Sequence, residues 1–190
     1  MGALISALIA FVLEAFPPAT KFTEKDVPDL SGSVAIVTGG YGGLGLETAK
    51  VLLTHNARVY LAGRNEKYAQ DAIRNLKEQT AKEAHFLHLD LSDLKAIKAA
   101  ADKFKSKESE LHMLFNNGGV MAPPVSQLTA DGYDLQFGTN VLGHYFFTML
   151  LMPELLSGTK SSQDGKVRVI NTASAGHQFN GLDFNTFKVQ

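Results

Sequence analysis

The chain has 190 residues, of which 45% are hydrophobic and 19% charged, which suits one domain with a sizeable buried core. Its formal net charge of −1 gives no extended basic surface, so nucleic acid is not an expected partner. The absence of cysteine excludes disulfides, zinc–thiolate sites and a cysteine nucleophile, and the six histidines show no metal-ligand spacing, so no metal is expected.

The N-terminal segment, residues 1–20, is apolar at nearly every position up to Phe16 and then reaches Pro17 and Pro18. It is shorter than the about 20 apolar residues that span a bilayer, it contains Glu14, and no Lys or Arg precedes it. Two interpretations stay open: a peripheral anchor in the membrane interface, or a helix packed on its own domain or on a partner. A removable signal peptide is the least favoured. We expect a cytoplasmic protein, associated with an intracellular membrane if the segment is an anchor.

Residues 21–32 read as a polar lead-in, and residues 33–190 as one domain in which strands and helices alternate. Short apolar runs predict strands at 33–37, 57–62, 84–89, 111–115 and 167–171. Helical spacing predicts helices at 43–54 and 65–80, a helix that Ser92 caps and that ends near Lys105, and a long helix at 129–156. Continuous apolar strands that alternate with helices indicate an α/β fold, a doubly wound parallel sheet covered on both faces.

A glycine-rich loop joins the first strand to the first helix. Glycine suits a tight turn at which a pyrophosphate must approach the backbone, and the helix N-terminus then offers free N–H groups to phosphate. Two templates fit the loop: G-x-G-x-x-G through Gly40, Gly42 and Gly45, and T-G-x-x-x-G-x-G through Thr38, Gly39, Gly43 and Gly45. The preceding strand and following helix favour a dinucleotide site over a glycine turn without a ligand.

Small or polar residues also follow each later strand. Because ligands of open parallel sheets bind beyond the carboxyl ends of the strands, these residues are expected at one edge. They are Arg64-Asn65 after the second strand, Asp90-Leu91 after the third, Asn116-Asn117-Gly118 after the fourth and Ser174 after the fifth.

With these motifs the chain resembles the short-chain dehydrogenases/reductases, and most of all their retinol-dehydrogenase-like fungal members, from about Asp26 to its last residue. The resemblance implies a Rossmann fold, a homodimer, and hydride transfer between NAD(P)(H) and a lipophilic carbonyl or alcohol substrate. It implies cofactor contacts from Thr38, Gly39, Tyr41, Gly42, Gly43, Leu44, Gly45, Asp90, Leu91, Asn116, Asn117 and Gly118. Asn116-Asn117-Gly118-Gly119 matches the family's N-N-A-G, with Gly118 in the alanine position. It implies catalytic roles for Asn140 and Ser174, whereas His144 and His177 are expected to be structural or solvent-facing.

Arg64 bears on the choice of cofactor. An NAD-preferring site usually places a carboxylate after the second strand, to bind the ribose 2′-hydroxyl. A guanidinium at this position would instead pair with a 2′-phosphate. We therefore predict a preference for NADP(H) through Arg64 with help from Asn65, with NAD(H) as the weaker cofactor.

The family's Tyr-x-x-x-Lys element is missing from the sequence: none of the five tyrosines has lysine four residues later. In the family this element follows the serine, and the tyrosine is the general acid/base. We therefore expect a truncated chain, inactive alone, whose sheet is incomplete at its C-terminal side and whose fifth strand is an unpaired edge. A truncated, non-catalytic NAD(P)-binding module is the alternative function. Another Rossmann activity, such as a methyltransferase, would leave Asn140 and Ser174 idle.

Overall fold

The computed structural model describes residues 6, 12–13, 16–174, 176, 181 and 183–187. Its contacts divide the chain into two units, Met1–Val27 with Ala173–Phe184 and Pro28–Thr172 with Asn185–Gln190. In the first unit, the short helix η1 (Glu24–Asp26) follows Thr23, whose backbone N–H donates to the Asp26 carboxylate over 2.7 Å. Most of the apolar segment 1–20 lies outside the described residues, and within those described no helix is long and apolar enough to cross a membrane.

The second unit is built on a sheet of five strands, and every neighbouring pair is parallel. The strand order β3-β2-β1-β4-β5 reverses between β1 and β4, which places a crevice beyond the carboxyl ends of these two strands. This confirms the predicted doubly wound parallel fold. The strands are β1 (Val34–Thr38), β2 (Arg58–Gly63), β3 (His85–His88), β4 (Met113–Asn116) and β5 (Arg168–Asn171).

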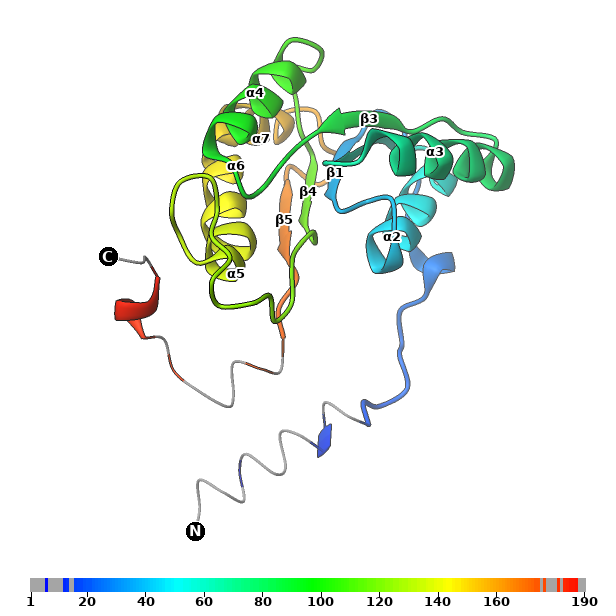
Figure 1. The fold of residues 1–190 in the computed structure, drawn as a ribbon. Helices are drawn as coiled ribbons and strands as arrows, with labels where there is room; N and C mark the ends of the chain where they lie inside the picture. Colours follow the sequence, from blue (N-terminus) through cyan, green and yellow to red (C-terminus); the bar gives the residue numbers. More distant parts are fainter. Residues whose placement is uncertain are drawn as a thin grey trace. The chain divides into compact units, whose positions relative to one another are not determined.

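Helices cover both faces of the sheet (Figure 1). One face carries α2 (Gly43–Thr54) and α3 (Glu66–Thr80). The other carries α4 (Leu94–Lys105), α6 (His144–Leu150) and α7 (Met152–Gly158).

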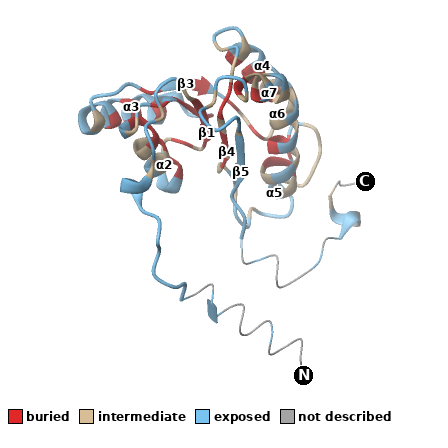
Figure 2. Cartoon of the chain, turned by 180° about the vertical axis from the view of Figure 1, so that it is seen from behind, coloured by how far each residue is buried: buried red, intermediate tan, exposed pale blue. Residues whose placement is uncertain are grey.

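Successive residues of a strand point to opposite faces, so β1 supplies two separate cores. Ala35 and Val37 join the core under α2 and α3, whereas Val34 and Ile36 join the core under α4 and α6. All five residues of β1 are buried, which explains why its sequence is a continuous apolar run (Figure 2). Burial of each large apolar side chain contributes about 1.5–3 kcal/mol.

The start of α4 differs from the prediction. Asp93, not Ser92, is its N-cap, and the Asp93 carboxylate accepts the backbone N–H groups of Lys95 and Ala96. Ser92 instead belongs to the turn before the helix, where its N–H and hydroxyl both donate to Asp90 Oδ1, over 2.9 and 2.6 Å.

The single helix predicted at 129–156 is also wrong. Residues 128–134 form a turn closed by a bridge between Leu128 and Asp134, with Gly132 at φ +79°. Asp134 then caps a helical stretch made of α5 (Leu135–Phe137), the π-helix η2 (Gly138–Gly143) and α6. This stretch ends at Leu151, where φ and ψ of −96° and 3° leave the helical region before Pro153 in α7. Helical spacing in the sequence does not distinguish a straight helix from this interrupted one.

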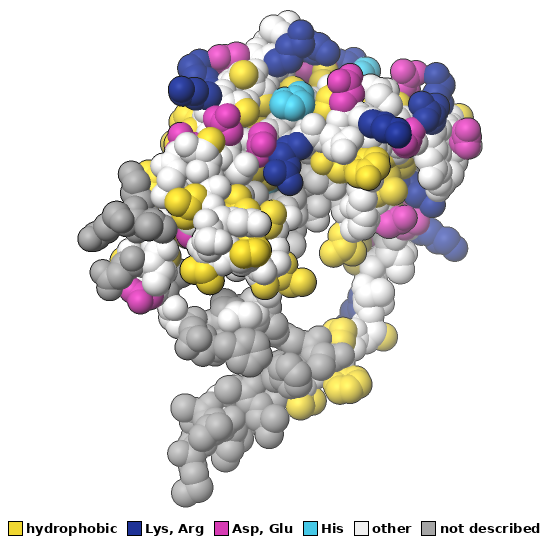
Figure 3. Space-filling model, viewed as in Figure 1, with side chains coloured by type: hydrophobic (Ala, Val, Ile, Leu, Met, Phe, Trp, Pro, Cys, Tyr) yellow, Lys and Arg dark blue, Asp and Glu magenta, His cyan; other side chains and the backbone are white. Residues whose placement is uncertain are grey.

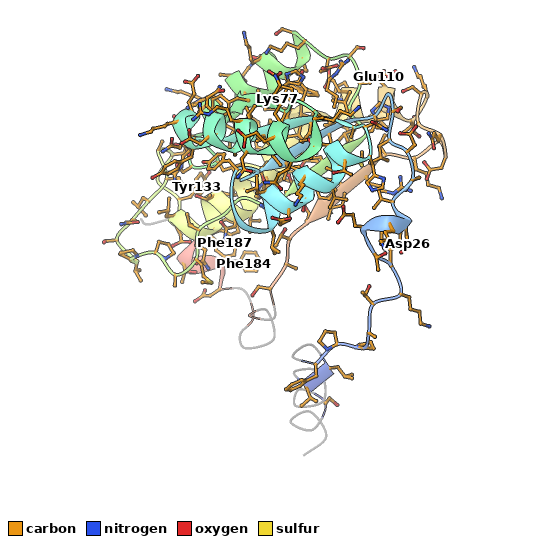
Figure 4. The ribbon with its side chains drawn as sticks, turned by 90° about the vertical axis from the view of Figure 1, so that its right-hand side faces the viewer. Asp26, Lys77, Glu110, Tyr133, Phe184 and Phe187 are labelled. Atoms are coloured by element: carbon orange, nitrogen blue, oxygen red, sulfur yellow. The ribbon has the colours of Figure 1, made fainter. Side chains whose placement is uncertain are left out.

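Residues 185–187 return to α5. The Phe187 ring stacks on Phe137 with centroids 3.9 Å apart, and the Asp134 N–H donates to the Phe187 carbonyl over 3.2 Å (Figure 4). β5 is the last strand of the described sheet, and its residues are exposed, including Val169 at 38% and Ile170 at 37%.

Cationic and anionic side chains are interspersed over the face shown in Figure 3. Several form local pairs, such as Lys77 with Glu83 and Lys98 with Asp102. Because both partners of these pairs are exposed to solvent, the pairs contribute little to stability.

Candidate functional site

A cavity of about 220 Å³ opens at the carboxyl edge of the sheet. It lies where β1, β2, β3 and β4 end, since parallel strands deliver all their carboxyl ends to one edge. The predicted site residues that line it are Gly39, Tyr41, Arg64, Asp90, Leu91 and Gly118, and the remaining lining residues are Ala62, Gly63, Leu89, Gly119, Val120 and Thr139.

The glycine loop follows the second of the two sequence templates. Gly39 and Gly43 have φ of +64° and +51°, a left-handed conformation that favours glycine. Gly42 is extended, with φ of −161°, and nothing lies within 4 Å of a Cβ atom added there. The two residues of the loop that need a left-handed backbone, Gly39 and Gly43, are therefore glycine positions of T-G-x-x-x-G-x-G.

Close packing imposes a second demand on this loop. A Cβ atom added at Gly45 would lie 2.5 Å from the carbonyl oxygen of Gly39 and 2.6 Å from Asn117 Nδ2. One added at Gly39 would lie 2.9 Å from Gly118 Cα. The start of α2, the end of β1 and the loop after β4 thus meet at backbone distance, and only glycine fits these positions.

The two asparagines at the end of β4, Asn116 in the strand and Asn117 after it, face the protein rather than the cavity. Asn117 Nδ2 donates to the Thr38 carbonyl over 2.9 Å. Asn116 is buried, and its Nδ2 donates to Thr148 and to Asn171. Of the N-N-G segment only Gly118 lines the cavity, so the asparagines tie β4 to β1 and β5 and shape the site indirectly.

Tyr41 and Arg64 form the rim of the cavity beside the end of β2. The Tyr41 ring lies over Gly63, in the space that a Cβ atom there would need, and its hydroxyl accepts the Asn65 N–H over 3.4 Å. The Asn65 side chain caps α3 by accepting the Tyr68 N–H. Arg64 is exposed and, within the described part of the chain, forms no salt bridge, so its charge is available to a ligand.

Asp90 combines a structural task with a place in the cavity. Its Oδ1 holds the turn at Ser92, as an aspartate that begins a helix turn would do, while the residue also lines the cavity. Asp90 thus lines the cavity and at the same time fixes the turn that leads into α4.

Asn140 stands in the π-helix η2, a helix type that often marks functional sites. Its side chain binds both backbone groups of Val120: Oδ1 accepts the N–H over 2.9 Å and Nδ2 donates to the carbonyl over 2.8 Å. Asn140 therefore positions the loop after β4, and Val120 in turn lines the cavity.

Comparison with known proteins agrees with this geometry. A family model described as short chain dehydrogenase matches residues 33–185. The chain belongs to the short-chain dehydrogenase family. A short-chain dehydrogenase/reductase of Armillaria gallica is 52% identical over 179 residues, which cover 94% of this chain and 57% of that protein. An uncharacterised oxidoreductase of Schizosaccharomyces pombe is 45% identical over 158 residues, 83% of this chain and 46% of that protein. The chain thus spans about half the length of these relatives.

Solved structures show the same arrangement. A complex of Pseudomonas aeruginosa RhlG with NADP is 26% identical, has a TM-score of 0.68, and is matched over 84% of this chain and 61% of its own. A metagenomic short-chain oxidoreductase in complex with NADP is 27% identical, has a TM-score of 0.63, and is matched over 75% and 62%.

Other predicted residues of this short-chain dehydrogenase lie away from the cavity. Thr38, Gly42, Gly43, Leu44, Gly45 and Asn65 support or flank it without lining it. Ser174 belongs to the smaller unit, where its hydroxyl accepts the Gly176 N–H over 3.1 Å, and its catalytic role stays a prediction. His177 lies outside the described residues.

Sequence reasoning missed Thr139. Its hydroxyl is buried, and it has no hydrogen-bond partner within the described structure although the residue lines the cavity. Only the neighbouring Asn140 carried a motif, and an isolated threonine gives no comparable signal.

A larger cavity of about 380 Å³ lies at the opposite edge of the sheet. There the polar groups bind one another: Arg58 pairs with Glu108 over 3.0 Å, and the Tyr60 hydroxyl donates to Glu108 over 2.7 Å. Burial, followed by this hydrogen bond, raises the pKa of Tyr60. Size alone would favour this cavity, but its mutually paired groups indicate a structural role.

Gly45→Ala and Gly42→Ala form a matched pair that tests the glycine template. We expect Gly45→Ala to lower the free energy of unfolding by about 1–3 kcal/mol because its Cβ meets backbone. Gly42→Ala should change it by less than about 0.5 kcal/mol. Urea denaturation without cofactor measures both, and equal losses would contradict the template.

Asn140→Ala tests the link to Val120. Loss of two hydrogen bonds should cost about 1–3 kcal/mol and speed amide hydrogen exchange at Val120. Exchange at Leu61 in β2 serves as the control and should change only by the overall loss of stability. Unchanged protection of Val120 would contradict the assignment.

Proposed function

We propose that this chain forms the cofactor-binding part of a short-chain dehydrogenase/reductase that transfers hydride between NADP(H) and a carbonyl/alcohol substrate. The observation that carries the proposal is the cavity at the carboxyl ends of β1 to β4, with the free cation of Arg64 at its rim. The NADP complexes of RhlG and of the metagenomic oxidoreductase support it, because the same fold binds that cofactor there.

The site fits part of a dinucleotide. At about 220 Å³ the cavity is smaller than the roughly 300–1,000 Å³ of typical ligand sites, so it would hold the adenosine end. The pyrophosphate would lie on the glycine loop, where open space beside Gly42 and Gly43 leaves the backbone accessible. The N-terminus of the 12-residue helix α2 adds a partial positive charge.

The end of β2 favours NADP(H) over NAD(H). No carboxylate stands at positions 63–65 to bind a ribose 2′-hydroxyl, whereas Arg64 offers a bidentate partner for a 2′-phosphate. We assign the 2′-phosphate to Arg64 and the adenine amino group to Asp90.

The bound nicotinamide supplies the hydride, and the protein positions the substrate and handles the proton. We propose that Ser174 orients the substrate carbonyl and that Asn140 acts through the loop it holds. Family resemblance supports a lipophilic substrate, a homodimer and peripheral membrane contact through residues 1–20, all of which remain proposals. The alternative, a non-catalytic NAD(P)-binding module, is favoured by the lack of a tyrosine with lysine four residues later.

The reductase and the non-catalytic binding module differ in whether the chain consumes NADPH when a carbonyl substrate is present. We expect the 190-residue chain to bind NADPH but to consume it negligibly with aliphatic or aromatic aldehydes, because an ordinary phenol titrates near pH 10 without a neighbouring lysine. Fluorescence titration measures binding and NADPH absorbance measures turnover. Rapid aldehyde reduction by the 190-residue chain would contradict this expectation.

Arg64→Asp tests the cofactor assignment. Loss of a charge-assisted pair and introduction of a like charge should weaken NADPH binding about 10- to 100-fold and leave NADH binding nearly unchanged. Arg74→Asp makes the same charge change farther along α3 and should leave the ratio of the two affinities unaltered. If Arg64→Asp binds NADPH as the wild type does, Arg64 does not hold the 2′-phosphate.

A further inference from the structure

One buried hydroxyl joins three segments around the cavity. Thr38 is fully buried at the end of β1, and its Oγ1 accepts the backbone N–H groups of Asn117 and Gly118 over 2.9 and 2.8 Å. The same oxygen lies 2.8 Å from Nε2 of His144, at the start of α6. His144 is itself buried, with 6% of its surface exposed.

The hydrogen-bond distances favour one arrangement of protons. A hydroxyl has one proton and two lone pairs, and the two N–H groups occupy both lone pairs of Thr38. Its proton therefore points to His144 Nε2, since the other acceptor, the Phe115 carbonyl, is farther away at 3.3 Å. His144 Nδ1 lies 2.9 Å from the Asn140 carbonyl, which can only accept. The ring is thus neutral, with its proton on Nδ1.

We infer that neutral His144 is a positioning residue for the cofactor site: it orients the Thr38 hydroxyl, which in turn holds the Asn117–Gly118 turn at the cavity wall. The inference rests on the proposed function, because its consequence is read in cofactor affinity. Gly118 lines the cavity and already meets Gly39 at backbone distance, so a small shift of this turn changes the site.

The surroundings of His144 keep it neutral. Burial lowers its pKa from the ordinary value of 6.5, and the bond to the Asn140 carbonyl opposes this in part. The strands and the π-helix beside it contain no charged residue: β1 is VAIVT, β4 is MLFN and η2 is GTNVLG. The packed helices α4 and α7 place apolar residues in the shared core, namely Ile97, Ala101 and Phe104 from α4 and Leu155 from α7, beside Phe147 of α6.

None of the hydrogen bonds described for the charged residues of α4 and α7 reaches the His144 ring. Lys98 pairs with Asp102, and Lys105 donates to the Leu150 carbonyl, six residues beyond His144. Lys95 and Lys103 complete the charged residues of α4, and Glu154 is the charged residue of α7. Tyr145, on α6 itself, is exposed.

Protonation would break this arrangement. A proton on Nε2 would face an oxygen whose lone pairs are both taken, so the N–H of Asn117 or Gly118 would lose its acceptor. Since the native state resists the proton that the unfolded chain accepts, stability contributed here is complete above pH 6.5 and declines as the pH falls below it. Cofactor affinity should decline in the same direction.

His144→Leu and His144→Gln test the inference, with His112→Leu as the matched control. His112 is equally buried and accepts the Val34 N–H, but at the opposite edge of the sheet. Titration calorimetry with NADP⁺ is run where all variants are folded. We expect His144→Leu to weaken binding by at least about fivefold, and His112→Leu to lower the melting temperature without changing affinity.

The glutamine variant supplies the second readout. Its amide oxygen can accept the Thr38 proton but does not titrate, so it should bind NADP⁺ nearly as the wild type does at neutral pH. As the pH is lowered from neutral through the range in which buried His144 titrates, which lies below 6.5, it should lose less affinity than the wild type. Titration of the 2′-phosphate is common to both proteins and cancels in this comparison.

Two results would overturn the inference: equal loss of affinity in His144→Leu and His112→Leu, or the same pH profile in wild type and His144→Gln. If the wild type itself does not bind NADP⁺, the proposed function fails. The link from His144 through Thr38 to the Asn117–Gly118 turn is then tested by amide hydrogen exchange at Asn117 and Gly118 in His144→Leu. Faster exchange there supports the positioning role, and unchanged exchange rejects it.

Discussion

The site depends on the backbone contact between the end of β1 and the loop after β4. Gly39 has no room for a side chain, since a Cβ atom there would lie 2.9 Å from Gly118 Cα, and Gly45 brings the start of α2 against the same point. Parallel pairing of Val37 with Phe115 delivers the two segments to the same level of the sheet. Without this contact the carboxyl ends of the strands would still share an edge, but no walled cavity would form between them.

The polar groups at the two cavities differ in whether they find partners within the described structure. At the amino edge, Arg58, Tyr60 and Glu108 satisfy one another, which avoids the cost of burying polar groups without partners. At the carboxyl edge, the charge of Arg64 and the buried hydroxyl of Thr139 lack partners within the described structure. A fold gains no stability from leaving a buried hydroxyl unpaired, so Thr139 at the cavity wall is a candidate for contact with a ligand.

The sequence predicted the strands and the glycine loop well because these follow from local rules. A continuous apolar run such as Val34–Val37 has few uses besides a buried parallel strand, and left-handed turns need residues such as Gly39 and Gly43. The cap of α4 was misplaced because Ser92 and Asp93 are both good caps, and only the contact of Ser92 with Asp90 decides between them. The interruption near Leu151 and the turn before Asp134 likewise depend on tertiary packing that helical periodicity does not encode.

The site residues likewise separate into those that local sequence rules predict and those that depend on tertiary contacts. Gly118, Arg64 and Asp90 were predicted because each follows a strand, and strand ends can be read from the sequence. The task of Asn140 was not predicted, since its partner Val120 stands 20 residues away in an irregular loop. His144 carried no motif at all, because its importance comes from the two lone pairs of Thr38 being already in use.

The cavity and the proposed catalytic serine belong to different units of this chain. Every residue that lines the cavity belongs to the larger unit, where close glycine packing and the hydrogen bonds of Thr38 and Asn140 hold it together. Ser174 belongs to the smaller unit. The geometry of the cavity is thus set by contacts within the larger unit that do not involve the proposed catalytic serine. A substitution at the rim of the cavity, such as Arg64→Asp, therefore leaves the smaller unit and Ser174 unchanged in sequence.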